Sequence, residues 1–243
     1  MVKHDRQERI DYLFDTDIKI IQSPDLFPFS LDSVLLARFV YVPIQKGRLV
    51  DLCTGNGAIP FLLTRRTKGK ITGIEIQSEV YELARRGAAL NGFCGQVDFI
   101  LGDAKDLPEK LGHSSCDVVT CNPPYFNQEA SRDQKLNRRL AIARHEILIT
   151  LNDVIKISGK LLKQNGKFAM VHRPERLVDI LAGMRQAKIE PKRLQLVHPK
   201  KDKAANMVLV EGAKGGRPGL KVLPPITVYD ADGHYTEDVL EKT

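Results

Sequence analysis

Short apolar, β-branched runs alternate with amphipathic helical patterns along most of the chain. Seven runs have the length and composition of buried strands, at residues 48–52, 71–76, 96–101, 117–121, 167–172, 193–198 and 206–211. Helical periodicity occupies residues 58–66, 79–91, 146–163 and 174–187. Strands joined by helices form right-handed βαβ units. The pattern therefore predicts an α/β fold, a Rossmann-like, doubly wound, mostly parallel seven-stranded sheet with helices on both faces.

Two further segments flank this pattern. We expect residues 1–45 to form an N-terminal extension with an apolar helix near residues 31–42, and residues 46–212 to form the main domain. Residues 213–243 are rich in Gly and Pro and are expected to pack on the same domain, with one strand near residues 226–229. Asn165-Gly166 is expected to end the long helix.

Composition and charge narrow the classes of protein that fit. Hydrophobic residues make up 42% of the chain, which excludes wholesale disorder. The net charge of +7 suggests a polyanionic partner, either a nucleic acid or a membrane surface. The longest apolar stretch is short and contains Arg38, and the first twenty residues are highly charged, so neither a membrane span nor a signal peptide is expected. The four cysteines include no CxxC pair, so we expect no metal site and a reducing, cytoplasmic location.

Acidic and glycine-rich loops follow the first three strands of the predicted sheet. The first loop is Asp51-Leu52-Cys53-Thr54-Gly55-Asn56-Gly57, the second strand ends at Glu75, and the third ends before Asp103. Ligands of such sheets bind at the carboxyl ends of the strands. Each acid alone also fits a helix N-cap. Three carboxylates at one edge would repel a pyrophosphate and attract a cation, so the loops predict a cationic nucleoside cofactor, S-adenosylmethionine.

The fourth strand runs into Asn122-Pro123-Pro124-Tyr125-Phe126. Prolines fix the backbone and donate no hydrogen bond, so this segment must leave the sheet as a rigid loop. The Asn122 side-chain oxygen and the Pro123 carbonyl are two acceptors suited to a planar amino group, and Tyr125 is suited to stacking on its ring. We therefore expect methyl transfer to an exocyclic or amide nitrogen, with Asn122, Pro123 and Tyr125 as the catalytic residues.

In order and spacing, the motifs DLCTGNG, GIE, GDA and NPPYF resemble those of class I S-adenosylmethionine-dependent methyltransferases, over about residues 45–212. Residues 27–36, 172–177, 214–217 and 222–225 are similar to the YfiC-like valine-tRNA adenine-N6 methyltransferase family, although Leu31-Asp32-Ser33 departs from a Thr-Asp-Gly pattern seen in that family. The resemblance implies a class I methyltransferase fold and modification of the adenine next to the anticodon. It also implies cofactor contacts from Asp32, Asp51, Thr54, Gly55, Asn56, Gly57, Glu75, Ile76, Asp103, Ala104 and Asn122.

The motif after the fourth strand does not separate three acceptors: adenine N6, guanine N2 in rRNA and protein glutamine N5. Basic residues favour a nucleic acid. Residues 185–221 contain ten basic and three acidic residues. A second basic stretch follows residues 122–126, which we call the reactive loop. We expect both clusters to border the edge where a base enters. The residues expected to bind RNA, and tRNA in particular, are Phe126, Arg132, Arg138, Arg139, Lys200 and Lys201.

Overall fold

The computed structural model describes residues 8–24, 26, 30–123 and 149–240. Within this part of the chain the strands are β1 (Arg9–Tyr12), β2 (Lys19–Gln22), β3 (Arg48–Leu52), β4 (Lys70–Glu75), β5 (Val97–Leu101), β6 (Cys116–Cys121), β7 (Leu162–His172), β8 (Ile189–Lys200), β9 (Met207–Lys214), β10 (Lys221–Val222) and β11 (Ile226–Tyr229). The helices are α1 (Leu31–Phe39), α2 (Ala58–Thr64), α3 (Ser78–Leu90), α4 (Leu107–Leu111), α6 (Leu151–Leu161), α7 (Leu177–Gln186) and α8 (Glu237–Leu240), with 3₁₀ turns η1 (Ala104–Asp106) and η3 (Pro174–Arg176).

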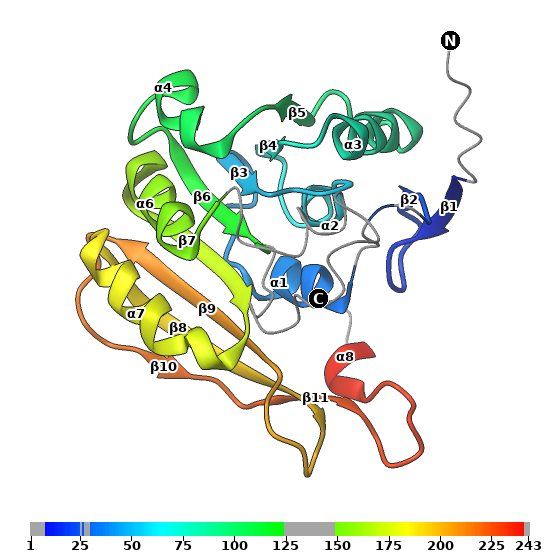
Figure 1. Ribbon diagram of the computed structural model, residues 1–243, viewed down its shortest axis with the longest axis vertical. Helices are drawn as coiled ribbons and strands as arrows, with labels where there is room; N and C mark the ends of the chain where they lie inside the picture. Colours follow the sequence, from blue (N-terminus) through cyan, green and yellow to red (C-terminus); the bar gives the residue numbers. More distant parts are fainter. Residues whose placement is uncertain (1–7, 25, 27–29, 124–148, 241–243) are drawn as a thin grey trace, which may run out of the picture.

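The main sheet has the predicted doubly wound topology (Figure 1). Its strand order is β10-β8-β9-β7-β6-β3-β4-β5, and β11 also pairs with β8. The neighbours of β3, β4 and β6 are all parallel, whereas β9 runs antiparallel to both β7 and β8. The seven predicted strands are confirmed, and β10 and β11 extend the sheet along β8. The chain order reverses between β3 and β6, which is where ligands bind in open sheets of this kind.

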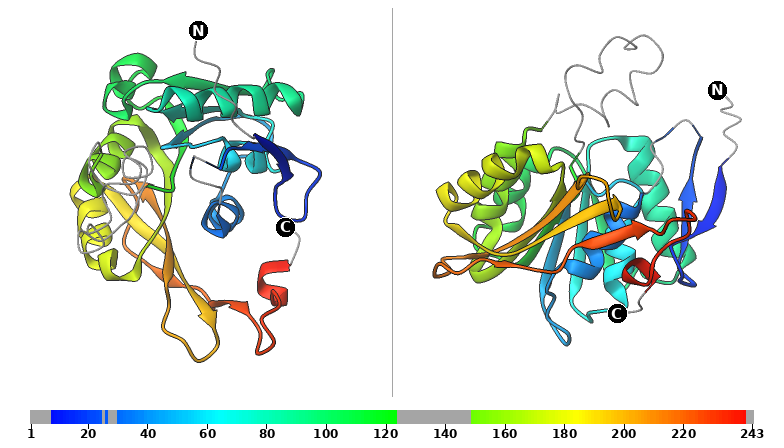
Figure 2. Two further views of the ribbon diagram at one scale, coloured as in Figure 1. Left: turned by 45° about the vertical axis from the view of Figure 1, so that its right-hand side comes forward. Right: turned by 90° about the horizontal axis from the view of Figure 1, so that it is seen from below.

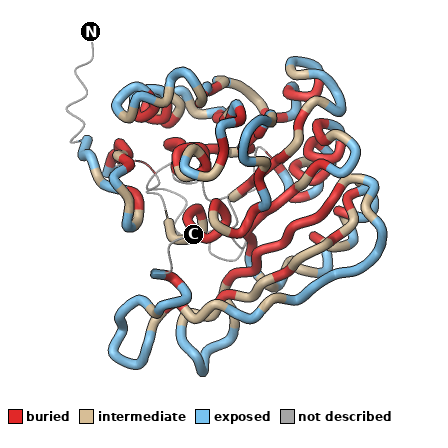
Figure 3. Tube along the Cα trace, turned by 180° about the vertical axis from the view of Figure 1, so that it is seen from behind, coloured by how far each residue is buried: buried red, intermediate tan, exposed pale blue. Residues whose placement is uncertain are grey.

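Helices cover both faces of the sheet (Figure 2). On one face lie α1, α2 and α3, and on the other lie α4, α6 and α7. Successive strand residues point to opposite faces. Leu49 and Val118 thus belong to the first core, and Val50 and Val119 to the second. Figure 3 shows the middle strands buried along their length, as expected for a parallel sheet covered on both sides.

The described residues of the N-terminal extension pack on the first face of the sheet. β1 and β2 pair as an antiparallel hairpin. Ile21 of β2, together with Leu26 from the segment after it, packs against Val80 and Leu83 of α3. α1 packs on α2 and also contacts β7 and β9. At the other end of the chain, α8 packs on β11, and the Val239 carbonyl accepts a hydrogen bond from Arg38 of α1.

Some predicted boundaries were wrong. The long helix ends at Leu161, not at Lys163, because buried Leu162 already pairs with Cys116 of β6. Asn165-Gly166 does not follow a helix; it lies in a bulge of β7, where Asn165 has a left-handed φ of 65°. The hairpin β1–β2 and the short elements α4, α8 and β10 were missed. No helix in the described residues is long and apolar enough to span a bilayer.

Candidate active site

The glycine-rich loop leaves β3 through three residues with left-handed backbone, namely Cys53, Gly55 and Gly57. A Cβ on Gly57 would lie 2.8 Å from Phe61 and 2.9 Å from Phe99, so only glycine fits there. A Cβ on Gly55 would meet no atom within 4 Å. The left-handed φ of 60° is therefore the one reason that this position favours glycine. The Asn56 side chain donates to the Ile21 carbonyl over 3.3 Å, which ties the loop to β2.

Asp51 lies beneath this loop and is only 1% exposed. One carboxylate oxygen accepts from the Thr120 hydroxyl at 2.6 Å, and the other accepts from the Thr54 hydroxyl at 2.7 Å. Burial removes the water that would stabilise the charge and raises the pKa of Asp51 to about 7, against the smaller opposing effect of the two hydroxyls. The side chain therefore contacts the loop through the Thr54 hydroxyl.

Glu75 joins the first two loops. One of its carboxylate oxygens accepts from the Gly55 N–H at 3.0 Å, and the other accepts from the Gln77 N–H at 2.9 Å. Burial raises the pKa of this carboxyl, while the backbone donors lower it. The neighbouring Ile76 side chain is 41% exposed, so a charged group and an apolar surface stand side by side at the end of β4.

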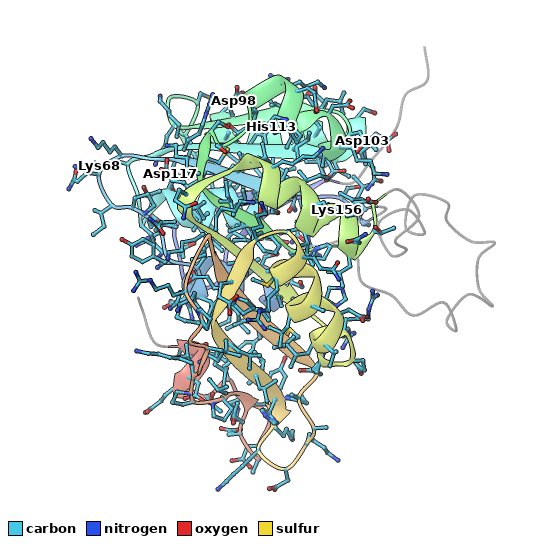
Figure 4. The ribbon with its side chains drawn as sticks, turned by 90° about the vertical axis from the view of Figure 1, so that its left-hand side faces the viewer. Lys68, Asp98, Asp103, His113, Asp117 and Lys156 are labelled. Carbon is cyan, nitrogen blue, oxygen red and sulfur yellow. The ribbon has the colours of Figure 1, made fainter. Side chains whose placement is uncertain are left out.

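The loop after β5 completes the acidic edge. The Gly102 N–H donates to the Glu75 carbonyl at 2.9 Å, which connects the second loop to the third. Asp103 is half-buried and caps η1, accepting from the Lys105 N–H at 2.9 Å, and Ala104 is buried beneath it. In Figure 4, Asp103 lies on the side of the carboxyl ends of the strands, and Asp117, near the start of β6, lies on the opposite side.

The reactive loop begins on the strand next to the glycine loop, because Leu52 of β3 pairs with Cys121 of β6. Asn122 is half-buried, and its Nδ2 donates to the Ser33 hydroxyl of α1 over 3.2 Å. Pro123 is buried. Tyr125, Phe126, Arg132, Arg138 and Arg139, which were also predicted at the site, lie outside the described residues.

Asp32 of α1 lies near Arg173, the residue that follows β7. Burial raises the pKa of the Asp32 carboxyl, and the Arg173 guanidinium and the Ser30 hydroxyl act in the opposite direction. The structure thus places Asp32 among residues at the carboxyl ends of the strands. Sequence reasoning missed its neighbour Ser33, whose only signal was its place beside Asp32 in a segment already singled out.

The basic residues of the 185–221 cluster, which was expected to border the edge where a base enters, are divided between the two ends of β8. Lys200 and Lys201 are exposed in the β8–β9 turn beyond the carboxyl ends of the strands. Lys188 and Lys214 lie at the other end of β8, because Ile189 pairs with Lys214. β8 has twelve residues, so at about 3.3 Å per residue the two groups are about 36 Å apart. Of these two groups in the described residues, the Lys200 group lies at the end of β8 that corresponds to the carboxyl ends of the parallel strands.

Comparisons with known proteins agree with this arrangement. The sequence profile of a family described as "Methyltransferase domain" matches residues 45–211. A tRNA1(Val) (adenine(37)-N6)-methyltransferase of Porphyromonas gingivalis is 31% identical over 134 residues, which cover 54% of this chain and 51% of that protein. The chain thus matches about half the length of that relative. A Shewanella protein of the same name is 22% identical over 89% of this chain and 90% of its own length.

Solved structures share the fold. A predicted O-methyltransferase from Agrobacterium tumefaciens superposes with a TM-score of 0.69 and 22% identity, over 86% of this chain and 94% of that protein. The YcgJ protein of Bacillus subtilis superposes with a TM-score of 0.56 and 14% identity, over 76% of this chain and 99% of that protein. Both comparisons confirm the mixed α/β fold with a mostly parallel central sheet.

Proposed function

Because this chain belongs to the methyltransferase-domain family, we propose that it transfers the methyl group of S-adenosylmethionine to the N6 amino group of an adenine in tRNA. The adjacency of Asn122 to the glycine loop carries this proposal, since β3 and β6 bring the amide acceptor beside the cofactor loop. The names of the Porphyromonas and Shewanella relatives support adenine and tRNA.

The residues at the strand ends fit a cationic nucleoside. Asp51 and Glu75 are buried acids with raised pKa values, and a cation nearby would stabilise their charged forms. The Gly55 and Gln77 N–H groups hold the two carboxylate oxygens of Glu75 at the end of β4, where this acid is proposed to accept the ribose hydroxyls. Ile76 offers an apolar surface and Asp103 an acceptor, both suited to an adenine ring. When bound, S-adenosylmethionine supplies a methyl group on a positively charged sulfur.

Asn122 and Pro123 act on the acceptor. The Asn122 side-chain oxygen and the Pro123 carbonyl each accept one hydrogen of the planar amino group, which orients the remaining electron density of the nitrogen toward the methyl group. The same two acceptors stabilise the positive charge that develops on the nitrogen. No strong base is needed, because the methylated nitrogen becomes acidic and loses its proton afterwards. Tyr125 is proposed to stack on the base.

The basic turn at Lys200 and Lys201 is proposed to contact tRNA phosphates, together with Arg132, Arg138 and Arg139. Phosphate contacts position the RNA without reading its sequence. An adenine in a tRNA loop is not paired in a duplex, so it can enter the site at low cost.

Labelled methyl transfer to total tRNA, rRNA, DNA and protein, followed by nucleoside and amino-acid analysis, tests the proposal. We expect the label in N6-methyladenine of tRNA. Label in N2-methylguanine of rRNA, or in N5-methylglutamine of protein, would show that the methyl acceptor is not adenine N6. Asn122→Ala should lose methyl transfer while S-adenosylmethionine still binds by calorimetry. Wild-type turnover in this variant would refute the assignment of the site.

A further inference from the structure

We propose that Ser33 is a positioning residue that fixes the side-chain amide of Asn122 in the orientation that methyl transfer requires. The observation is the hydrogen bond of 3.2 Å from Asn122 Nδ2 to Ser33 Oγ. The contact joins α1 to the first residue after β6, two elements 89 positions apart in sequence. The inference rests on the proposed function, since it concerns how Asn122 is presented to an amino group.

The orientation matters because a side-chain amide has one face that accepts and one that donates. With Nδ2 directed toward Ser33, the Oδ1 atom is the part of the amide left to accept a hydrogen from the substrate nitrogen. The reversed amide would present its own N–H groups to an amino group, and two donors repel each other. A partner that holds Nδ2 therefore favours the productive orientation.

Ser33 can do this because α1 is held firmly at its C-terminal end. Arg66 donates to the Ala37 carbonyl and, at 2.9 Å, to the Val40 carbonyl. Arg193 donates to the Phe39 carbonyl at 2.7 Å, and its guanidinium lies over the Phe39 ring at 4.8 Å from the centroid.

A buried carboxylate completes this attachment. Glu211 of β9 accepts both guanidinium contacts of Arg193 at 2.9 Å and the Tyr41 N–H at 2.7 Å. The helix is thereby fixed to the sheet, and Ser33, which is 8% exposed, has little freedom to move away from Asn122. A rigid support of this kind is what a positioned catalytic group needs.

The hydroxyl of Ser33 is not needed to start α1. Ser30 is the N-cap residue, and the Ser33 N–H donates to the Ser30 carbonyl at 3.1 Å. By contrast, Ser158 is a buried serine of α6 whose hydroxyl donates to the Val154 carbonyl of its own helix at 2.8 Å. Ser158 lies on the opposite face of the sheet, so it is a matched control for the loss of a buried helical hydroxyl.

The test is steady-state kinetics of the full-length Ser33→Ala protein with tRNA and S-adenosylmethionine. Loss of one neutral hydrogen bond predicts a kcat about three- to tenfold lower, with KM for tRNA and Kd for S-adenosylmethionine changed by less than about twofold. Ser33→Thr, which keeps the hydroxyl, should recover most of the loss. Ser158→Ala should lower the Tm without lowering kcat. An unchanged kcat in a folded Ser33→Ala protein would overturn the inference.

A double-mutant cycle separates this inference from the proposed function. Asn122→Asp removes the Nδ2 donor, so adding Ser33→Ala to it should lower kcat by less than about twofold further. An equal loss in both backgrounds would show that Ser33 acts without Asn122 and would overturn the inference alone. Wild-type kcat in Asn122→Ala, which removes the side-chain acceptor, would overturn the proposed role of Asn122 and the inference with it.

Discussion

Replacing Asp51 by Asn should remove a large part of the pH dependence of stability. The carboxyl is buried between Thr54 and Thr120, and burial raises its pKa from 3.8 to about 7. A carboxyl with a raised pKa in the folded protein favours the folded state only while it is protonated. Its contribution is therefore fully present below about pH 4 and is lost as the pH rises to about 7.

The magnitude follows from the two pKa values. Each unit of pKa corresponds to about 1.4 kcal/mol, so the unfolding free energy of the wild type should fall by about 4 kcal/mol between pH 4 and pH 7 on account of Asp51. Asn is neutral throughout this range, and both threonine hydroxyls can accept hydrogen bonds from its amide as well as donate to it. The variant should match the wild type near pH 4 and exceed its stability at pH 8.

Urea denaturation of both proteins from pH 4 to pH 8, without S-adenosylmethionine, measures this difference. Asp202→Asn, which removes an exposed charge in the β8–β9 turn, is the control for net charge. A difference between Asp51→Asn and the wild type that does not grow with pH would refute the reasoning. With saturating S-adenosylmethionine the gap should narrow, because a nearby cation stabilises the charged carboxylate.

Three further outcomes are expected. Gly57→Ala should lower the unfolding free energy by about 2–4 kcal/mol and Gly55→Ala by about 1–2 kcal/mol. Both positions have a left-handed backbone, but only a Cβ on Gly57 would crowd aromatic rings. Equal losses in urea denaturation would contradict this. Glu211→Gln should lower the unfolding free energy by about 2–3 kcal/mol, since it breaks a largely buried bidentate ion pair with Arg193. An unchanged urea midpoint would show that this ion pair does not stabilise the fold. Charge reversal at Lys200 and Lys201 should weaken tRNA binding and reduce its salt dependence while leaving cofactor affinity intact. Reversal at Lys188 and at Lys192, the fourth residue of β8, should have a smaller effect on tRNA binding, and filter binding at two salt concentrations measures the difference.

The sheet could be predicted from sequence because its strands carry strong local signals. Residues 48–52 and 226–229 form strands with the predicted limits, since each is a short, mainly apolar run with clear boundaries. The β1–β2 hairpin was missed because Arg9–Tyr12 is largely exposed and charged, and its pairing with β2 supplies the structure. The end of the long helix was misplaced because pairing of Leu162 with β6 outweighed the Asn-Gly signal three residues later.

The candidate site was predictable to a similar extent. Strand-end acids follow directly from the strand limits, so Glu75 and Asp103 lie where the pattern indicated. The contact of Asp51 with Thr120, the contact of Asn56 with Ile21, and the contact of Asn122 with Ser33 join residues far apart in sequence. No local pattern reports such pairs. The division of the basic residues between the two ends of β8 likewise required the strand direction to be known.

The hydrogen bonds of the two asparagines have a consequence for how enzymes of this kind diversify. The sequence profile begins at residue 45, yet Asn56 and Asn122 each contact a residue that precedes this limit, Ile21 and Ser33. Changes in the N-terminal segment can therefore alter the conformation of the glycine-rich loop and the orientation of the Asn122 amide, while every residue of the recognisable motifs stays the same. Two relatives with identical motifs could in this way differ in turnover, and comparing motifs alone would not reveal why.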